Sequence, residues 1–380
     1  MSHRAHRPSD SSEFRSGDGP HSEGRRARLI GLVVLMIGSL ALVGASAHAA
    51  TTSPGHPQAK AYQFNAPFSI TSDGTHLWAA NGEGNSVTEV AVSTGKLVRV
   101  IQGSQYGFNS PARVADIGGH IWVTNEYGAS ITEFAASTGK LIRIIKGSQY
   151  AFNWPFGIAD NGTHVWVTNA KGESITELAA STGNLIRVIS GAKYDFNFPS
   201  SIVRNGSHLF VISPRGSSVT EIDASTGDLV RVINAAADGL VWPEGIASDH
   251  SHIWVANEGE PATDKGESVS ELSASTGHLV RVIKASKDKL HSPDGVTSNG
   301  SDVWVTNQYG ESVTELKAST GQLVRVLKGS KYGFGAPGPI VIVGSHIWVA
   351  NTLSGPFKNG DLGSLTEFVA ATGKVVRVLK

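Results

Sequence analysis

The sequence predicts an all-β fold, a seven-bladed β-propeller with four antiparallel strands per blade. A Ser-Thr-Gly or Ala-Thr-Gly turn recurs along the chain, with its glycine at Gly95, Gly139, Gly183, Gly227, Gly277, Gly321 and Gly373. The steps between these glycines are 44, 44, 44, 50, 44 and 52 residues. A proline recurs in the same way, at Pro67, Pro111, Pro155, Pro199, Pro243, Pro293 and Pro337. Seven copies at the length of one blade therefore predict seven blades.

The chain before the first repeat divides into three parts. Residues 1–28 are polar and basic, and with so few apolar side chains they are expected to be disordered. Residues 29–49 are expected to be a signal peptide or a transmembrane anchor, because arginines precede an uncharged run and small residues follow it. Residues 50–66 have the composition of a linker, and residues 67–380 form the propeller. Both alternatives for the apolar run place the propeller outside the cytoplasm, secreted or anchored.

The composition excludes several classes of function. The chain has no cysteine, which rules out disulfides, zinc-thiolate sites and thiol nucleophiles. Basic and acidic residues balance at 32 each, and the first 50 residues hold six arginines and four acids. The remainder is slightly acidic, so the basic surface of a nucleic-acid binder is not expected.

One repeat contains the four strands of a blade. In the second copy, Arg113 to Ile117 is a short strand after a proline, and His120 to Thr124 is rich in β-branched and aromatic residues. Ser130 to Ala135 is the third strand and Lys140 to Ile145 the fourth. The turn between them ends at Gly139, where a positive φ is expected. The array starts at an innermost strand and ends at an outermost one, so closure is expected to rest on blade 7 packing against blade 1.

Residues present in every blade are interpreted as structural, because a residue repeated seven times cannot mark one site on a closed ring. The second-strand tryptophan is expected to pack between blades, the histidine two places before it to hydrogen-bond within its blade, and the terminal asparagine to close its turn. A sugar platform, metal-binding histidines and a ligand-binding ring of asparagines are the alternative interpretations. Each third-strand Glu lies about opposite a fourth-strand Arg, as Glu89 and Arg99 do. We expect these to be exposed pairs, worth about 0.2 to 1 kcal/mol each.

The blades differ on one face of the predicted disc, where the links between blades and the turns after the second strands open. The turns after Asn257 and Asn351 are longer than in the other copies. Variable loops on one rim of a rigid scaffold are where binding sites usually lie. The candidate ligand-binding residues on this face are Arg113, Trp154, Phe198, Trp242, Glu244, Glu258, His291 and Asp294.

Two interpretations stay open for these candidates. Trp154 and Trp242 either pack against the adjacent proline or line a binding surface. Glu244 and Asp294 are either solvated charges or a carboxylate pair at the channel mouth. Such a pair would suit a cationic ligand or a hard cation such as Ca²⁺ or Mg²⁺.

The motifs Pro155-Phe156-Gly157-Ile158 and Pro243-Glu244-Gly245-Ile246, each followed by Ile/Val-Trp-Val-(Thr/Ala)-Asn, resemble NHL and YVTN propeller repeats. Over residues 67–380 the chain is also similar to the streptogramin lyase (virginiamycin B lyase) family. The resemblance implies the propeller fold and a range of activities that includes sensors, scaffolds, lyases and lactone hydrolases. Streptogramin lyase-like repeats often carry Glu where this chain has Asn, so no catalytic residue is transferred.

Two functional hypotheses follow. The first is an extracytoplasmic sensor or scaffold, a monomer that binds a protein, glycan or small molecule and touches the membrane through its N-terminal segment alone. The second is a metal-assisted lyase or lactone hydrolase with its site at the channel mouth, which would use Glu244, His291 and Asp294.

Overall fold

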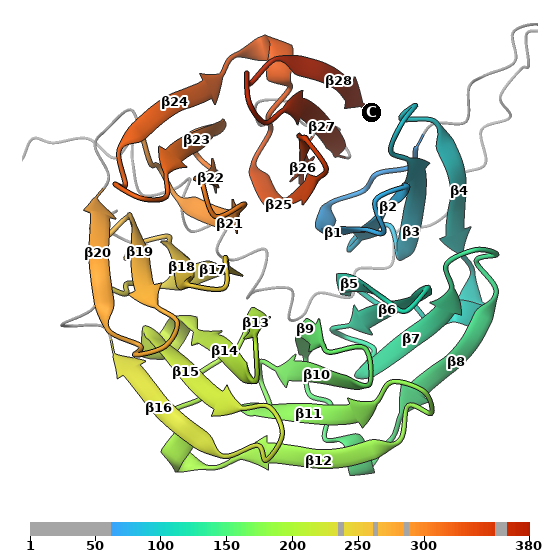
Figure 1. Cartoon of the computed structure of the whole chain (residues 1–380). Coiled ribbons are helices and arrows are strands. Elements are labelled where there is room, and N and C mark those ends of the chain that lie inside the picture. Colours follow the sequence, from blue (N-terminus) through green and yellow to red (C-terminus); the bar gives the residue numbers. More distant parts are fainter. Residues whose placement is uncertain (1–61, 235–238, 261–264, 285–288, 354–362) are drawn as a thin grey trace, which may run out of the picture. The chain divides into compact units, whose positions relative to one another are not determined.

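The computed structural model describes residues 62–234, 239–260, 265–284, 289–353 and 363–380. These residues form seven four-stranded antiparallel sheets, each with its strands in sequence order, arranged as blades around a central channel (Figure 1). The first strand of every blade lies innermost and the fourth outermost. The predicted seven-bladed propeller is therefore confirmed.

The strands of the first four blades are β1 (Pro67–Ser72), β2 (His76–Asn81), β3 (Ser86–Ala91), β4 (Leu97–Gln102), β5 (Pro111–Ile117), β6 (His120–Asn125), β7 (Ser130–Ala135), β8 (Leu141–Lys146), β9 (Pro155–Asp160), β10 (His164–Asn169), β11 (Ser174–Ala179), β12 (Leu185–Ser190), β13 (Ile202–Asn205), β14 (His208–Ser213), β15 (Ser218–Asp223) and β16 (Leu229–Asn234). Those of the last three are β17 (Pro243–Ser248), β18 (His252–Asn257), β19 (Ser268–Ser273), β20 (Leu279–Lys284), β21 (Pro293–Ser298), β22 (Asp302–Asn307), β23 (Ser312–Lys317), β24 (Leu323–Lys328), β25 (Pro337–Val343), β26 (His346–Asn351), β27 (Ser364–Val369) and β28 (Val375–Leu379). Short 3-10 turns are η1 (Ser104–Tyr106), η2 (Ser148–Tyr150), η3 (Ala192–Tyr194), η4 (Pro214–Gly216) and η5 (Ser330–Tyr332).

Blade boundaries follow the sequence pattern closely. In the second blade the innermost strand begins at its proline, two residues before Arg113, because Pro111 already pairs with Asn125 of β6. The turn glycines have the positive φ that the Ser-Thr-Gly motif predicts, 69° at Gly139. A side chain in that conformation would be strained, which explains why glycine ends the turn.

The ring closes by packing blade 7 against blade 1, as expected from the sequence. Among the described residues, no strand is exchanged between the two sheets, since β1 to β4 and β25 to β28 each pair among themselves. Ile70 and Leu77 of blade 1 share one buried cluster with Trp348 and Leu365 of blade 7. Hydrophobic contact between side chains therefore holds the two ends of the array together.

The second-strand tryptophans fill the spaces between blades, which confirms their predicted role. Trp78 of blade 1 packs with Ile121, Val123 and Phe134 of blade 2. Blade 4 has a phenylalanine in place of the tryptophan. The residue at this position is at most 1% exposed in every blade: Trp78, Trp122, Trp166, Phe210, Trp254, Trp304 and Trp348. Large buried aromatics of this kind supply much of the apolar burial that stabilises a core.

The Glu–Arg pairs are in register as predicted, but the expectation that they are exposed is wrong. Glu133 pairs with Arg143 across the hairpin at 2.6 Å, and the Glu133 side chain is 0% exposed. Nδ1 of His120 lies 2.6 Å from the other carboxylate oxygen, so the predicted histidine bond within the blade is confirmed. The carboxylate is buried because β7 lies inside the blade, between β6 and the outer β8. Sequence spacing alone could not reveal that burial.

Each of these arginines also reaches the next blade. Nη2 of Arg143 donates to the carbonyl oxygen of Ser181 at 3.0 Å, in the Ser-Thr-Gly turn of blade 3. Arg377 of the last strand makes the same bond to Ser93 of blade 1, at 3.3 Å. The repeated pair is thus also an inter-blade link that continues across the closure.

The second-strand asparagines bond mainly to side chains of the neighbouring strand and not, as we had predicted, to the backbone of their own turns; Asn257 and Asn307 each add one long contact to a backbone oxygen, at 3.5 Å. Nδ2 of Asn125 donates instead to the hydroxyls of Ser130 and Thr132 on the neighbouring strand, at 3.2 and 2.9 Å. Asn125 is fully buried. The amide is drawn to these hydroxyls because a buried polar group needs hydrogen-bond partners.

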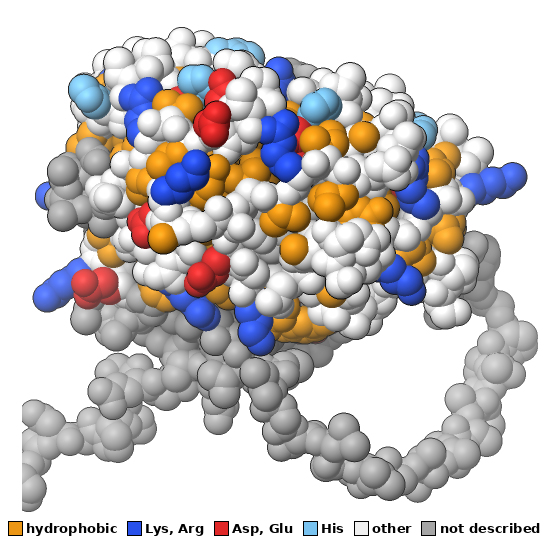
Figure 2. Space-filling view, turned by 90° about the horizontal axis from the view of Figure 1, so that it is seen from below, with side chains coloured by type: hydrophobic (Ala, Val, Ile, Leu, Met, Phe, Trp, Pro, Cys, Tyr) orange, Lys and Arg blue, Asp and Glu red, His pale blue; other side chains and the backbone are white. Residues whose placement is uncertain are grey.

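The outer wall of the propeller mixes apolar with Lys and Arg side chains, and Figure 2 shows this pattern edge-on. A Val or Ile on each fourth strand is about two-fifths exposed, as Ile142 is at 41%. The interspersed charges discourage edge-to-edge pairing of these outer strands.

Several expectations lie outside the described residues. The disordered region, the signal or anchor segment and most of the linker fall within residues 1–61, and parts of both long turns fall within 261–264 and 354–362. Among the residues that the structure describes, no helix has the length and apolar character needed to cross a membrane.

Candidate functional site

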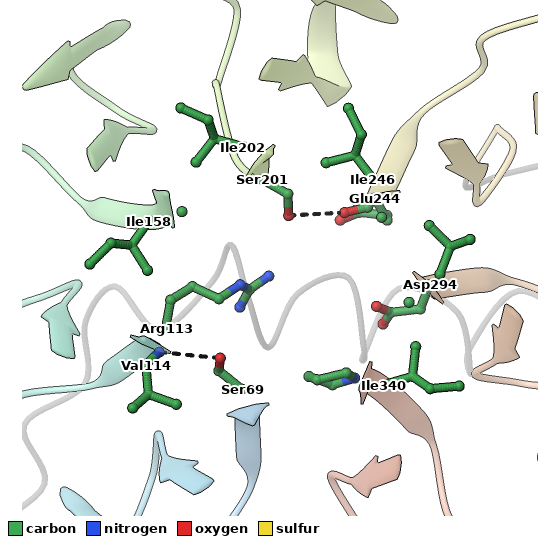
Figure 3. A pocket seen from close by; sticks show the side chains of 15 residues that line it. Ser69, Arg113, Val114, Ile158, Ser201, Ile202, Glu244, Ile246, Asp294 and Ile340 are labelled. Carbon is green, nitrogen blue, oxygen red and sulfur yellow. Dashed lines mark hydrogen bonds between the residues drawn. The ribbon is translucent and has the colours of Figure 1, made fainter. Parts of the chain in front are cut away.

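A cavity of about 220 Å³ lies in the central channel, between the innermost strands of all seven blades (Figure 3). It is lined by the first residues after the proline that recurs in every blade. The third residue after that proline is a β-branched apolar residue in every blade: Ile70, Val114, Ile158, Ile202, Ile246, Val296 and Ile340. Six of these side chains line the cavity directly.

Glycines let neighbouring innermost strands approach closely at the cavity. A Cβ built on Gly245 would lie 2.1 Å from the backbone oxygen of Asp294, and one on Gly157 would lie 2.2 Å from that of Ser200. Any larger residue would push the two strands apart. The Pro-x-Gly pattern is therefore explained by the close packing of blades around the channel.

Arg113 of β5 extends into the cavity from blade 2 (Figure 3). Its Nη1 donates to the carbonyl oxygens of Phe68 and Ala112, both at 3.1 Å, and its guanidinium stacks on Phe156 at 4.1 Å from the ring centroid. In the described part of the chain, no carboxylate oxygen lies within 4 Å of its guanidinium nitrogens. Burial lowers the pKa of Arg113, while the charges of Asp294 and other acids oppose that effect. The guanidinium remains charged.

Glu244 and Asp294 face Arg113 from the opposite side, at the first position after the prolines of blades 5 and 6 (Figure 3). Burial raises the pKa of Asp294 to about 6, although the charge of Arg113 acts in the other direction. Nε2 of Gln308 donates to its carboxylate at 3.3 Å. Burial, followed by repulsion from Glu258 and Asp294, raises the pKa of Glu244 well above its usual value.

The structure thus brings three predicted site residues together, Arg113, Glu244 and Asp294. It shows them half-buried in a cavity, so the interpretation of Glu244 and Asp294 as fully solvated charges is not supported. Opposite charges separated across a confined space attract more strongly than they would in water.

The predicted aromatic residues do not line the cavity, and two of them, Trp154 and Phe198, contact each other outside it. The ring of Trp154 contacts those of Tyr127 and Phe198 edge-on, at centroid distances of 5.7 and 6.1 Å. Lys171 lies over Trp154 at 5.4 Å, and Arg215 lies over Phe198 at 4.2 Å. Links and second-strand turns therefore meet on one face, as the strand directions predicted.

The residue before the repeated proline, where these aromatics stand, has a left-handed backbone conformation in every blade. Trp154 and Trp242 have positive φ values of 58° and 51°, and Phe198 has 63°. The carbonyl oxygen of Trp154 accepts a hydrogen bond from the N–H of Ala170 at 2.9 Å, and that of Trp242 accepts one from Glu258 at 3.0 Å. This left-handed turn sets the direction in which these side chains leave the backbone.

Glu258 and His291 lie outside the cavity lining. Oε1 of Glu258 accepts a hydrogen bond from the Ser292 hydroxyl at 3.0 Å. The His291 ring contacts Tyr309 at a centroid distance of 6.0 Å. Across the described residues, no three His, Asp or Glu side chains gather in a way that could hold a metal ion.

Sequence reasoning missed two residues near the site. Glu126 follows the terminal Asn of blade 2, is 7% exposed, and interacts electrostatically with Arg113. Burial raises its pKa to about 7. Its position matches that of Glu258 in blade 5, which could have signalled it. Ser201 lines the cavity, and its hydroxyl donates to the carbonyl oxygen of Glu244 at 3.2 Å.

No family model matches the sequence, and no curated protein matches it either. Solved structures do share the fold. A streptogramin B lyase superposes with a TM-score of 0.60 and 16% identity, over 76% of this chain and 91% of the lyase. The fold is that of a streptogramin lyase-like propeller.

Two further solved structures resemble the propeller. A catalytically inactive virginiamycin B lyase from Staphylococcus aureus, determined with quinupristin, gives a TM-score of 0.62 and 18% identity over 76% of this chain and 92% of the lyase. Hydrazine synthase from Kuenenia stuttgartiensis gives 0.65 and 19%, over 83% of this chain and 99% of the matched chain. At these identities the likeness establishes the fold and carries no activity across.

Proposed function

We propose that this protein is an exported binding propeller, a sensor or scaffold module that holds a small ligand in its central channel. The observation that carries the proposal is the charged cavity of Arg113, Glu244 and Asp294. The residues that recur in every blade have structural roles, so they do not compete with these three as candidates for binding.

The three charges are not needed by the propeller itself. At the position of Glu244 and Asp294 the other blades carry Phe68, Ala112, Phe156, Ser200 and Gly338. At the position of Arg113 they carry Ser, Gly or Pro. Burying charged groups costs stability unless they are paired. Charged side chains that the fold does not require, and whose burial lowers the stability of the protein, are candidates for binding a ligand.

The alternative hypothesis of a metal-assisted lyase or lactone hydrolase lacks this kind of support. His291 does not line the cavity and its ring contacts Tyr309, and the described residues contain no metal donor set. We therefore propose binding rather than catalysis for the channel.

Release of bound small molecules tests the proposal. The full-length protein is isolated from the cells that express it and denatured, and the released compounds are compared by mass spectrometry. The double variant Glu244→Gln and Asp294→Asn should release less of a compound that the wild type carries, with nearly unchanged melting temperature. Thr138→Ala, in a turn on the opposite face, is the matched control and should release as much as wild type. Equal release from the double variant would contradict a channel site.

Export is a separate part of the proposal. It is supported by Arg25, Arg26 and Arg28 before the uncharged run from Leu29 to Ala47. Fractionation of the native cells, with and without replacement of the three arginines by glutamate, tests it. Protein that stays in the cytoplasm when the arginines are intact would contradict export.

A further inference from the structure

We infer that the channel cavity takes a small zwitterion, an α-amino acid with a branched apolar side chain. This inference rests on the proposed function, because it names the ligand class of the same site. Three observations carry it: an arginine with no carboxylate within ion-pair distance among the described residues, two carboxylates across from it, and a ring of branched aliphatic side chains around these charged groups.

Arg113 is arranged to receive a carboxylate. One nitrogen, Nη1, is used by the two backbone carbonyls, and the stack on Phe156 fixes the plane of the guanidinium. Among the described residues, the other N–H groups of this side chain donate to no protein acceptor, and the side chain extends into the cavity (Figure 3). A planar fork of this kind binds a carboxylate through two parallel hydrogen bonds.

Asp294 and Glu244 are arranged to receive an ammonium group. Both line the cavity opposite Arg113, on adjacent blades. Each carboxylate is disfavoured in its charged form by burial, and Glu244 also by the charges of Glu258 and Asp294. An ammonium group placed between them would offset that repulsion and donate further hydrogen bonds to the two carboxylates.

The opposed charges discriminate against ligands that carry one charge. A bare carboxylate would satisfy Arg113 but would lie near two carboxyl groups, and a bare amine would leave Arg113 facing an added positive charge. Leaving a desolvated charge without its partner costs more than the new contact contributes. A ligand with both groups close together meets both requirements.

The apolar ring and the volume limit the size of the ligand. Ile158, Ile202, Ile246, Val296 and Ile340 present branched aliphatic side chains to the cavity. The volume of about 220 Å³ is below the roughly 300 to 1,000 Å³ of pockets for drug-sized molecules. A free amino acid such as leucine is small enough for a cavity of this volume.

Calorimetric titration of the full-length protein with three probes tests the inference. The probes are L-leucine, 4-methylpentanoate, which lacks the amine, and 3-methylbutylamine, which lacks the carboxylate. We expect leucine to bind at least tenfold more tightly than either analogue. Arg113→Met should abolish the advantage of leucine over the amine, and Asp294→Asn its advantage over the carboxylate.

Arg204→Gln is the matched control, because Arg204 is an exposed arginine on the innermost strand of blade 4 that does not line the cavity. This variant should bind leucine as wild type does, and the melting temperature of every variant is measured alongside. A loss of binding in Arg204→Gln equal to that in Arg113→Met would overturn the assignment of the carboxylate to Arg113.

The outcomes separate this inference from the proposed function. If 3-methylbutylamine binds as tightly as leucine, the cavity is a cation site. If 4-methylpentanoate binds as tightly as leucine, it is an anion site. Either result would overturn the inference of a zwitterionic ligand. If none of the three binds while a different compound is released from the wild type and not from the double variant, the ligand class is wrong and the channel site stands. If none binds and no compound is released, both are wrong.

Discussion

Replacing Arg143 by alanine tests the meaning of the repeated Glu–Arg–His arrangement. Arg143 lies 2.6 Å from the fully buried carboxylate of Glu133, and also bonds to Ser181 of the next blade. The substitution leaves a buried negative charge with His120 as its remaining partner, 2.6 Å away. The inter-blade bond is lost as well.

The size of the effect follows from burial. Removing one partner of a buried ion pair costs about 3 to 5 kcal/mol, whereas an exposed pair is worth about 0.2 to 1 kcal/mol. Arg143 is 25% exposed, and water can partly replace it. We therefore expect Arg143→Ala to lower the free energy of unfolding by about 2 to 3 kcal/mol.

A double-mutant cycle measures this directly. Urea unfolding of the full-length protein, followed by tryptophan fluorescence, is compared for wild type, Arg143→Ala, Glu133→Gln and the combined variant. Glu133→Gln removes the charge that Arg143→Ala strands, so the combined variant should recover at least half of the loss. Arg143→Lys, which keeps the charge without the fork, should lie between wild type and alanine.

A loss below about 0.5 kcal/mol in Arg143→Ala would refute the reasoning, since it would mean that the pair behaves like an exposed one. A loss that the combined variant does not recover would show that the bond to Ser181, rather than the carboxylate, carries the effect.

Three further predictions concern pH, the channel wall and ring closure. Burial raises the pKa of Glu126 from 4.5 to about 7 in the folded protein, so its contribution to stability is full below pH 4.5 and falls as the pH rises to about 7. The fall is on the order of 3 kcal/mol, and Glu126→Gln should remove it from unfolding curves measured between those pH values. Gly245→Ala should destabilise by about 2 kcal/mol or more, because its Cβ would lie 2.1 Å from a backbone oxygen of the next blade; thermal melting equal to wild type would contradict that close approach. Deleting Val375 to Lys380 removes Arg377 and the buried Leu379 at the closure, and we expect a soluble protein with a lowered melting temperature. Complete loss of folding would mean that β28 is essential to close the ring.

The period, the turn glycines and the second-strand tryptophans were enough to predict the blades and their number. These features act locally: a glycine such as Gly139 permits a positive φ wherever its blade sits, and an alternating strand places Trp122 on a sheet face in any context. The repeated residues could also be separated from the variable ones without any structure, and that separation put Arg113, Glu244 and Asp294 among the candidates.

Only the tertiary structure decided which candidates meet and which charges are buried. Arg113, Glu244 and Asp294 come together because closure of the ring turns every innermost strand toward one axis, whereas His291, two residues before Pro293, is directed to Tyr309. Glu133 is buried because its strand is covered by its neighbours within the blade. Burial and convergence depend on radial position and on the adjacent blade, and neither is encoded in the spacing of residues along one repeat.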